Sequence, residues 1–227
     1  MEQKNNAKTR ERKKTVHIFF TVDDNYVPFL STTIVSLIAH TSKKYNYEIT
    51  VIHDGLSLAS KKRIKSYENK KNVSIKFFNI APKLNSISVR LDVRDYYTIS
   101  TYYRLFLPNL FSRLSRGLYL DCDIVVLDDV AKLYFTDLEN KSVAAVSDSS
   151  VQLYDEFATY VEAVIKMNHE EYFNAGVLLM NFKKLREIDL EKQAFQLLEK
   201  VTFKVAQDQD ILNYLLKGDV KLLPINW

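Results

Sequence analysis

Short apolar runs recur along the chain and are separated by polar or charged segments. Residues 16–22 are rich in β-branched and aromatic side chains, which is typical of a buried strand. Residues 73–78 alternate between apolar and polar positions, which also predicts a strand. The predicted strands and short apolar runs are 16–22, 48–53, 73–78, 117–120, 124–127, 143–146 and 175–180.

Helical periodicity fills most of the gaps between these runs. Apolar pairs recur every four residues after Pro28, which predicts a helix with one buried face. These pairs are Phe29/Leu30, Thr33/Ile34 and Leu37/Ile38. Further helices are predicted over 57–69, 97–111, 183–200 and 208–217. Residues 82–95 and 147–173 are weakly patterned and are expected to form loops over a site.

This alternation of strands and helices predicts an α/β fold with a mainly parallel central sheet. No internal repeat and no linker divides the chain, so residues 15–227 are expected to form a single domain. In sheets of this kind, ligands bind beyond the carboxyl ends of the strands. The polar residues next to the predicted strands are therefore the candidates for a functional site.

Positive charge is concentrated at the start of the chain. Residues 1–14 contain six Lys and Arg against two Glu, a surplus equal to the net charge of +4 for all 227 residues. Such a segment can bind nucleic acid or an anionic membrane surface. A disordered, solvated tail is the favoured interpretation, because the remainder of the chain is close to neutral. We therefore expect no nucleic-acid partner and at most peripheral membrane contact.

The composition narrows the class of protein further. With only 4 Gly and 4 Pro, collagen-like and low-complexity structures are excluded. No stretch of ~18 apolar residues occurs, and the start lacks the apolar core of a secretory signal. The single cysteine, Cys122, cannot form an internal disulfide. A cytoplasmic location, including the inner face of the membrane, is expected.

The sharpest local feature is Asp121-Cys122-Asp123, directly after the apolar run 117–120. Two carboxylates one residue apart at the end of a strand repel each other unless a cation lies between them. Mg²⁺ and Mn²⁺ prefer oxygen ligands of this kind. A solvated turn also explains many Asp-x-Asp sequences, but the apolar runs on both sides favour a metal site here.

Three further polar segments could meet these carboxylates. Asp23-Asp24-Asn25 ends the first predicted strand, and in a parallel sheet that end lies on the same edge as Asp121. Asp and Asn also favour ordinary turns, so this segment is weak evidence by itself. The other two segments are Phe173-Asn174-Ala175-Gly176 and Asp208-Gln209-Asp210, and Asp208 could equally cap a helix.

Other kinds of chemistry are poorly supported. The four histidines, His17, His40, His53 and His169, lack the spacing of metal ligands, and two of them lie in predicted strands. No glycine-rich phosphate loop and no serine-hydrolase motif occurs. A diphosphate would therefore be held chiefly by a metal ion and by basic side chains.

Five segments, taken in order, resemble retaining glycosyltransferase family 8, the group that contains bacterial lipooligosaccharide galactosyltransferases and glycogenins. They are IFFTVDDNYVPFLSTTIVSL, ISTYYRLFLPNLF, RGLYLDCDIVVLDDVAKLY, YFNAGVLLMNFKKLR and QDQDILNYLLKG, and the resemblance runs from about residue 16 to the end. It implies the GT-A fold, with a single nucleotide-diphospho-sugar-binding domain. It also implies Mn²⁺ or Mg²⁺ as cofactor and a UDP-sugar as donor.

The resemblance further implies roles for individual residues. Asp121 and Asp123 would bind the metal ion and, through it, the diphosphate. The implied catalytic residues are Arg104, which would reach the donor sugar and its phosphate, Asp208, which would bind a sugar hydroxyl, and Gln209, near the anomeric carbon. The uridine would be held by Asp23, Asn25 and the backbone near Thr21. The full set of implied donor-binding residues is Thr21, Asp23, Asn25, Arg104, Asp121, Cys122, Asp123, Asp148, Asn174, Asp208 and Gln209.

The resemblance implies transfer of a hexose with retention of anomeric configuration. Galactose and glucose are favoured as the hexose because members of the family commonly transfer them, and the acceptor would be a glycan, lipid-linked or protein-linked. Because the Gln209 amide is a weak nucleophile, attack on the same face as departure is favoured over a covalent intermediate. Two alternatives stay open: a non-catalytic UDP-sugar-binding fragment and a haloacid-dehalogenase-type phosphatase. In that phosphatase, Asp121 would be the nucleophile and Asp123 the acid.

The family pattern continues past the equivalent of Pro224-Ile-Asn-Trp227 into a segment with a metal-binding histidine and a lysine for the diphosphate. Neither residue follows Trp227 in this sequence. The resemblance therefore implies a metal ion held by two protein ligands, weaker UDP binding and impaired transfer. Asp128 or Asp129 is the alternative source of a third ligand.

Overall fold

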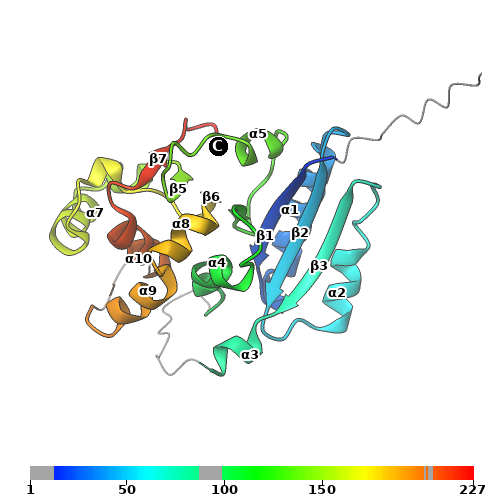
Figure 1. The fold of residues 1–227 in the computed structure, drawn as a ribbon, viewed down its shortest axis with the longest axis horizontal. Helices are drawn as coiled ribbons and strands as arrows, with labels where there is room; N and C mark the ends of the chain where they lie inside the picture. The colour runs from blue at the N-terminus through cyan, green and yellow to red at the C-terminus, as the bar shows by residue number, and fades with distance from the viewer. Residues whose placement is uncertain (1–12, 87–98, 202, 204–206) are drawn as a thin grey trace, which may run out of the picture.

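In the computed structural model, residues 13–86, 99–201, 203 and 207–227 are described. Within these residues, seven strands form one sheet with the order β3-β2-β1-β4-β6-β5-β7 (Figure 1). The strands are β1 (Thr15–Thr21), β2 (Asn46–His53), β3 (Val73–Asn79), β4 (Gly117–Leu120), β5 (Val143–Ala145), β6 (Val177–Met180) and β7 (Val220–Leu222). Only β6 runs against its neighbours in this sheet. The predicted α/β fold with a mainly parallel sheet is confirmed.

The first half of the chain is a regular succession of strands and helices. Helix α1 (Val27–Ala39) joins β1 to β2 and begins with Pro28 in its first turn, as the pattern predicts. Helix α2 (Leu58–Lys65) joins β2 to β3 and is capped by Ser57, whose side chain accepts a hydrogen bond from the backbone of Ser60. The four-residue apolar repeat thus corresponds to α1, and the helix predicted over 57–69 corresponds to the shorter α2.

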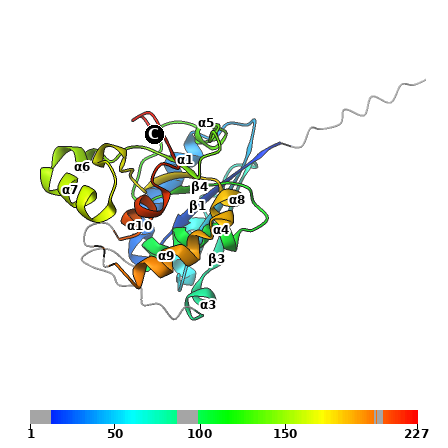
Figure 2. The same cartoon turned by 60° about the vertical axis from the view of Figure 1, so that its left-hand side comes forward.

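Helices cover both faces of the sheet, and the alternation of side chains along the strands separates two cores (Figures 1 and 2). Ile18 and Phe20 face one core, which includes side chains of α1, α2 and α5 (Ala131–Tyr134). Phe19 faces the other core. That second core includes side chains of the 3₁₀ helix η2 (Ile99–Phe106) and of α4 (Leu107–Leu110), α8 (Phe182–Glu187), α9 (Leu190–Leu198) and α10 (Gln207–Leu216).

The second half of the chain corrects several predictions. Residues 147–173, predicted as loops, form α6 (Ser149–Leu153), α7 (Asp155–Tyr160), the π-helix η3 (Val161–Ile165) and the 3₁₀ helix η4 (His169–Glu171). These helices are too short for a periodic pattern, and side chains such as Asp148 and Asn168 cap them locally. The predicted helix 183–200 is divided into α8 and α9 at Asp189, whose φ of 52° lies in the left-handed region.

Three other predictions need adjustment. Residues 124–127 form no strand, although they are apolar. The predicted helix 97–111 is η2 followed by α4, and its first two residues lie outside the described part of the chain. The predicted loop 82–95 begins within α3 (Ala81–Leu84), and its residues from 87 onward lie outside the described part of the chain. Residues 1–12 of the basic tail also lie outside it. No helix of the described residues is long and apolar enough to cross a membrane.

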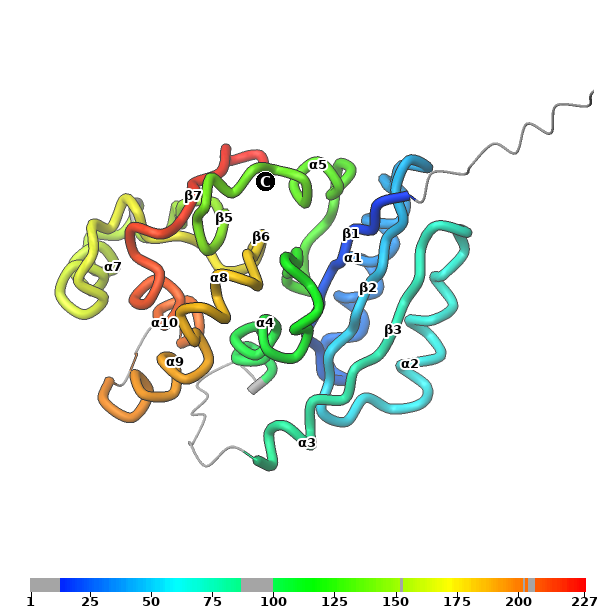
Figure 3. Tube along the Cα trace, in the orientation of Figure 1, coloured from blue at the N-terminus to red at the C-terminus, as the bar shows by residue number. Residues whose placement is uncertain are grey.

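The strand directions determine which loops meet. Strands β1 and β4 are parallel neighbours, so the turns that follow them lie on the same edge of the sheet. Because β6 is antiparallel to β4, with Leu120 opposite Val177, the segment before β6 begins at that edge as well. The tube in Figure 3 shows how far apart in the chain these segments are, since β1 is blue, β4 is green and β6 is yellow to orange. Three distant parts of the sequence thus converge on one edge.

Candidate functional site

A pocket of about 280 Å³ opens at this edge of the sheet. Its lining residues are Thr21, Val22, Tyr26, Ser100, Thr101, Arg104, Tyr119, Asp121, Cys122, Asp123, Asn174, Ala175, Gly176, Asp208 and Gln209. All of the predicted donor-binding residues are in this lining except Asp23, Asn25 and Asp148. The structure therefore brings most of the predicted residues together in one cavity.

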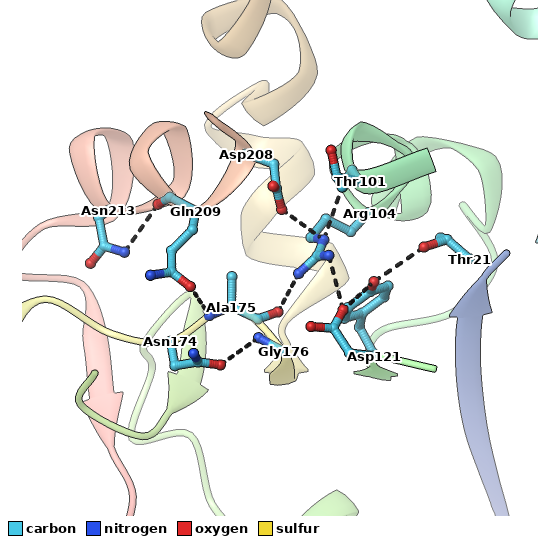
Figure 4. A network of polar contacts seen from close by, with 11 residues as sticks. Thr21, Thr101, Arg104, Asp121, Asn174, Ala175, Gly176, Asp208, Gln209 and Asn213 are labelled. Atoms are coloured by element: carbon cyan, nitrogen blue, oxygen red, sulfur yellow. Dashed lines mark hydrogen bonds and ion pairs between the residues drawn. The ribbon is translucent and has the colours of Figure 1, made fainter. Parts of the chain in front are cut away.

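Arg104 lies at the centre of a network of polar contacts (Figure 4). The residue is only 5% exposed, and its side chain donates hydrogen bonds through Nε to Thr101 O, through Nη1 to Ala175 O, and through Nη2 to Asp121 Oδ1 at 3.0 Å. The guanidinium carbon also lies 4.2 Å from the centroid of the Tyr119 ring. These contacts hold the cation in a single position beside the pocket.

The buried partner of this cation is Asp208, in the first turn of α10. Arg104 Nε lies 2.9 Å from Asp208 Oδ2, and this contact is an ion pair without hydrogen-bond geometry. Burial raises the pKa of Asp208 to about 6, although the charge of Arg104 acts in the opposite direction. Burial lowers the pKa of Arg104, but Asp208, Tyr119 and Asp121 outweigh this effect and raise it overall. Arg104 therefore stays charged.

The Asp121 turn, defined as residues 121–126, follows β4. Asp121 Oδ1 accepts hydrogen bonds from Arg104 and from the hydroxyl of Tyr119, and the Tyr119 hydroxyl is 3.1 Å from Thr21 Oγ1. The backbone N–H of Asp121 donates to Gly176 O. Sequence reasoning did not identify Tyr119. The sequence signal for Tyr119 was its position two residues before Asp121, because side chains two residues apart along an extended chain point to the same face of the sheet.

Glycine is favoured at position 176 because neighbouring side chains lie close to its Cα atom, and not because of its backbone angles. A Cβ atom at this position would lie 2.7 Å from Asp121 Oδ2 and 3.0 Å from Asn174 Oδ1. Asn174 Oδ1 accepts a hydrogen bond from the Gly176 N–H at 2.8 Å, which closes a tight turn before β6. The absence of a side chain at residue 176 therefore leaves room for both the Asp121 carboxylate and the Asn174 amide beside this backbone.

The far wall of the pocket comes from α10 and the segment before β6. Gln209 Oε1 accepts a hydrogen bond from Ala175 N at 2.9 Å, and Gln209 Nε2 donates to Asp148 Oδ2 at 2.8 Å. Asn174 Nδ2 donates to the same Asp148 oxygen at 3.3 Å. Asp148 thus lies behind the lining and orients two amides that face the pocket, whereas the resemblance implied that it binds the donor.

The other polar residues of α10 hold the same segment from inside. Asn213 is buried and bonds the backbone of Phe173 twice, accepting from its N–H and donating to its carbonyl. Asp210 is fully buried and accepts hydrogen bonds from the hydroxyls of Tyr160 and Tyr172. Of the motif Asp208-Gln209-Asp210, only the first two residues therefore line the pocket.

The Asp23 turn, defined as residues 22–26, follows β1. Asp23 Oδ1 accepts hydrogen bonds from the backbone N–H groups of Asn25 and Tyr26, at 2.9 and 3.1 Å. Asp24 points to α2, where it accepts hydrogen bonds from Ser57. Val22 and Tyr26 line the pocket, whereas Asp23 and Asn25 lie between them in the turn.

The carboxylates after β4 are the residues that could hold a metal ion. Asp123 is exposed, and the contacts of Asp121 described above use Oδ1, so Oδ2 is turned to the side of Gly176. Burial raises the pKa of the Cys122 thiol to about 12, so the thiol is protonated at neutral pH. Within the described residues, no group of three His, Cys, Asp or Glu side chains that could hold a metal ion occurs.

The suggestion that Asp128 or Asp129 supplies a third ligand is wrong. Asp128 forms an ion pair with Lys132 at 2.6 Å on the exposed surface. Asp129 accepts hydrogen bonds from the Tyr47 hydroxyl and from the backbone of Ala131, where it begins α5. Both carboxylates are therefore engaged away from the pocket.

The chain is similar in sequence to several known proteins. The family model described as "Glycosyl transferase family 8" matches residues 17–227. General stress protein A of Bacillus subtilis (strain 168) is 28% identical over 213 residues, which cover 90% of this chain and 70% of that protein. A lipopolysaccharide 1,2-glucosyltransferase of Escherichia coli (strain K12) is 28% identical over 216 residues, covering 92% of this chain and 60% of that protein.

Solved structures agree with this similarity. The galactosyltransferase LgtC, in complex with donor and acceptor sugar analogs, matches with a TM-score of 0.74 and 31% identity, over 91% of this chain and 73% of LgtC. The bifunctional glycosyltransferase WbbM matches with a TM-score of 0.83 and 30% identity, over 96% of this chain and 40% of WbbM. The chain thus spans only part of the length of these relatives. The family match excludes the haloacid-dehalogenase-type alternative, and the fold agrees with GT-A structures. The chain belongs to glycosyltransferase family 8.

Proposed function

We propose that this chain transfers a hexose from a UDP-sugar, with UDP-galactose or UDP-glucose favoured, to a glycan, lipid-linked or protein-linked acceptor with retention of anomeric configuration. The observation that carries the proposal is the arrangement of charge in the pocket. Asp121 and Asp123, the buried cation of Arg104, and the amides of Asn174 and Gln209 line one cavity. This combination suits a metal-bound diphosphate on one side and a sugar on the other.

A divalent metal ion would be held by Asp121 and Asp123. Their carboxylate oxygens are the ligand type that Mn²⁺ and Mg²⁺ prefer. When bound, the metal ion neutralises charge on the diphosphate and stabilises it as a leaving group. Because the described residues bring no third carboxylate, imidazole or thiolate to these two, we expect the metal affinity to depend on the diphosphate.

Arg104 would stabilise the negative charge that develops on the departing diphosphate. Its guanidinium has five N–H donors, of which the protein contacts above engage three, so donors remain for a ligand in the pocket. Because the group is already fixed, it needs no reorganisation when charge develops. In this proposal Asp208 both orients Arg104 and meets a hydroxyl of the donor sugar.

The contacts of Gln209 support attack on the same face as departure. A covalent intermediate on this residue would require its carbonyl oxygen to attack the anomeric carbon. That oxygen already accepts a hydrogen bond from Ala175, and the other end of the amide is bound to Asp148. In the proposed mechanism Gln209 therefore orients the donor sugar, and the acceptor hydroxyl attacks a short-lived, oxocarbenium-like centre.

The nucleoside would lie toward the Asp23 turn. Thr21 and Tyr26 line that side of the pocket, and Asp23 and Asn25 are placed in the turn between them. Residues 15–227 would act as one donor-binding domain in this proposal. A non-catalytic UDP-sugar-binding fragment stays as the second candidate.

A panel of UDP-sugars, assayed with and without Mn²⁺, tests the proposal. We expect UDP release from one or two of the sugars and only with the metal ion. NMR spectroscopy of the product should show the anomeric configuration of the donor. Tight binding of UDP-sugars with no release of UDP would favour the binding fragment. Equal release in the presence of a chelator would contradict the metal role of Asp121 and Asp123.

A further inference from the structure

Two hydroxyl side chains of α1 contact the backbone of the Asp121 turn. Thr33 Oγ1 lies 2.8 Å from Cys122 O and 2.6 Å from Ile124 O. These two carbonyl groups flank Asp123 in the chain. The Thr33 hydroxyl therefore contacts the backbone on both sides of one of the two candidate metal ligands.

Ser36, one turn further along α1, continues this contact. Its Oγ accepts a hydrogen bond from Val126 N at 3.0 Å and donates to Thr33 O at 2.9 Å. Residues 122, 124 and 126 are thus each bound to α1 through the backbone, although residues 121–127 have no strand or helix structure of their own. We call Thr33 and Ser36 the α1 clasp.

The Thr33 hydroxyl is buried, so its hydrogen-bond partners matter for stability. The residue is 0% exposed, and it belongs to the face of α1 that buries Leu30, Ile34 and Leu37. A hydroxyl group in such a place costs free energy unless it is hydrogen-bonded, and packing alone would be served by an aliphatic side chain. The single O–H donor of Thr33 is shared between the Cys122 and Ile124 carbonyls of the Asp121 turn or alternates between them.

We propose that the α1 clasp positions Asp123 for metal and diphosphate binding. This inference rests on the proposed function, because it concerns the same metal site. Thr33 and Ser36 do not line the pocket, so they act through the backbone of the turn. Without the clasp, the exposed Asp123 carboxylate would occupy several positions, and the metal-dependent part of nucleotide binding would weaken.

The variant Thr33→Val tests the clasp, because it keeps the shape of the side chain and removes the hydroxyl. Titration calorimetry with UDP, in Mn²⁺ and in EDTA, separates the metal-dependent part of binding. We expect the Kd of UDP to rise about tenfold in Mn²⁺ and to stay unchanged in EDTA. Thr33→Ser restores the hydroxyl and should recover most of the affinity.

Thr32→Val is the matched control. Thr32 is the neighbouring residue on the exposed face of α1, and its hydroxyl reaches only Pro28 O of the same helix, at 3.5 Å. It should bind UDP like the unmodified chain. Ser36→Ala removes the single hydrogen bond of Ser36 to the turn, together with its bond to Thr33 O, and should raise the Kd in Mn²⁺ about threefold. This variant keeps the proposal testable if Thr33→Val does not fold.

Two results would overturn the clasp. Unchanged UDP affinity in Mn²⁺ for both Thr33→Val and Ser36→Ala would show that the turn needs no support from α1. Equal weakening in Mn²⁺ and in EDTA would show a general structural role. Asp123→Asn distinguishes failure of the clasp from failure of the proposed function. If UDP binding to this variant keeps its full dependence on Mn²⁺, the assignment of Asp123 as a metal ligand is wrong.

Discussion

The two acidic turns at the edge of the sheet are held in opposite ways. In the Asp23 turn, the Asp23 carboxylate is held locally, because it bonds the backbone two and three residues further along, and only Asp24 among the side chains described above reaches a distant element, at Ser57. The Asp121 turn depends on distant elements instead. Its contacts come from Arg104 in η2, Gly176 before β6, and Thr33 and Ser36 in α1.

This difference shows that one edge of the sheet can combine a turn capped by its own side chain with a turn held by distant elements. A self-capped turn forms wherever an Asp precedes suitable backbone N–H groups. The Asp121 turn takes its shape only after both halves of the chain have packed, so its carboxylates are placed by the whole fold. Substitutions far from Asp121 and Asp123 should therefore affect the second turn, whereas the first should respond mainly to its own residues.

The largest expected effect follows from removing the cation that holds the Asp121 turn. Arg104→Met leaves the Asp208 carboxylate buried without its partner and removes a donor from Asp121. We expect a loss of about 3–5 kcal/mol in the free energy of unfolding, measured by urea denaturation. The exposed Arg113→Met serves as control and should change it by less than about 0.5 kcal/mol. A loss of similar size in both variants would contradict the central role of Arg104.

The two carboxylates of the Asp121 turn should differ from each other. Asp121→Asn and Asp123→Asn should each weaken Mn²⁺-dependent UDP binding by about hundredfold, since each removes a charged ligand. Only Asp121→Asn should also lower the free energy of unfolding, by about 1–2 kcal/mol, because Asp121 bonds Arg104 and Tyr119. Asp128→Asn, outside the pocket, is the control. Equal stability of both variants would show that the buried network does not need the Asp121 charge.

The pH dependence of stability should report the burial of Asp208. Its pKa is about 6 in the folded protein against 3.8 as the ordinary value, so unfolding releases a proton between these values. The free energy of unfolding should therefore fall by about 3 kcal/mol as the pH rises through this interval, from the contribution of this residue alone. Asp208→Asn should lack that decrease in urea denaturation at a series of pH values. Parallel pH profiles for the two proteins would contradict the raised pKa.

A smaller effect is expected at the close approach between the Asp121 turn and the segment before β6. Gly176→Ala would place a methyl group against Asp121 Oδ2 and Asn174 Oδ1. We expect the Kd of UDP in Mn²⁺ to rise about tenfold as these side chains move. Gly55→Ala is the matched control, because no atom lies within 4 Å of a Cβ built there. The close approach would be unimportant if both variants bound UDP equally well.

The smallest effect should come from the self-capped turn. Asp23→Ala removes the acceptor for two backbone N–H groups and should lower the free energy of unfolding by about 1 kcal/mol. Asp23→Asn keeps a capping oxygen and should be nearly as stable as the unmodified chain. In the proposed assignment, Asp23→Ala also weakens UDP binding equally with and without Mn²⁺. A purely Mn²⁺-dependent loss would place Asp23 with the metal site instead.

Most of the fold was predictable because burial leaves a periodic record in the sequence. The apolar run before Asp23 and the four-residue repeat after Pro28 correspond to β1 and α1. The helices between residues 149 and 171 were missed because α6 and η4 are only five and three residues long, and because α7 continues directly into the π-helix η3, whose period differs from that of an α-helix. The break at Asp189 was missed because apolar positions continue on both sides of it.

The sequence by itself predicted residues that line the pocket: two carboxylates after a strand, an arginine in a segment that resembles the family, and two amides. Only the tertiary structure decided how they are held. The pattern of α1 assigned Thr33 to an apolar stripe, yet its hydroxyl bonds the Asp121 turn. Asn174 precedes its strand, and it reaches the pocket because β6 is antiparallel. Periodicity records whether a side chain is buried, but its hydrogen-bond partner depends on the order and direction of strands that are far apart in the chain.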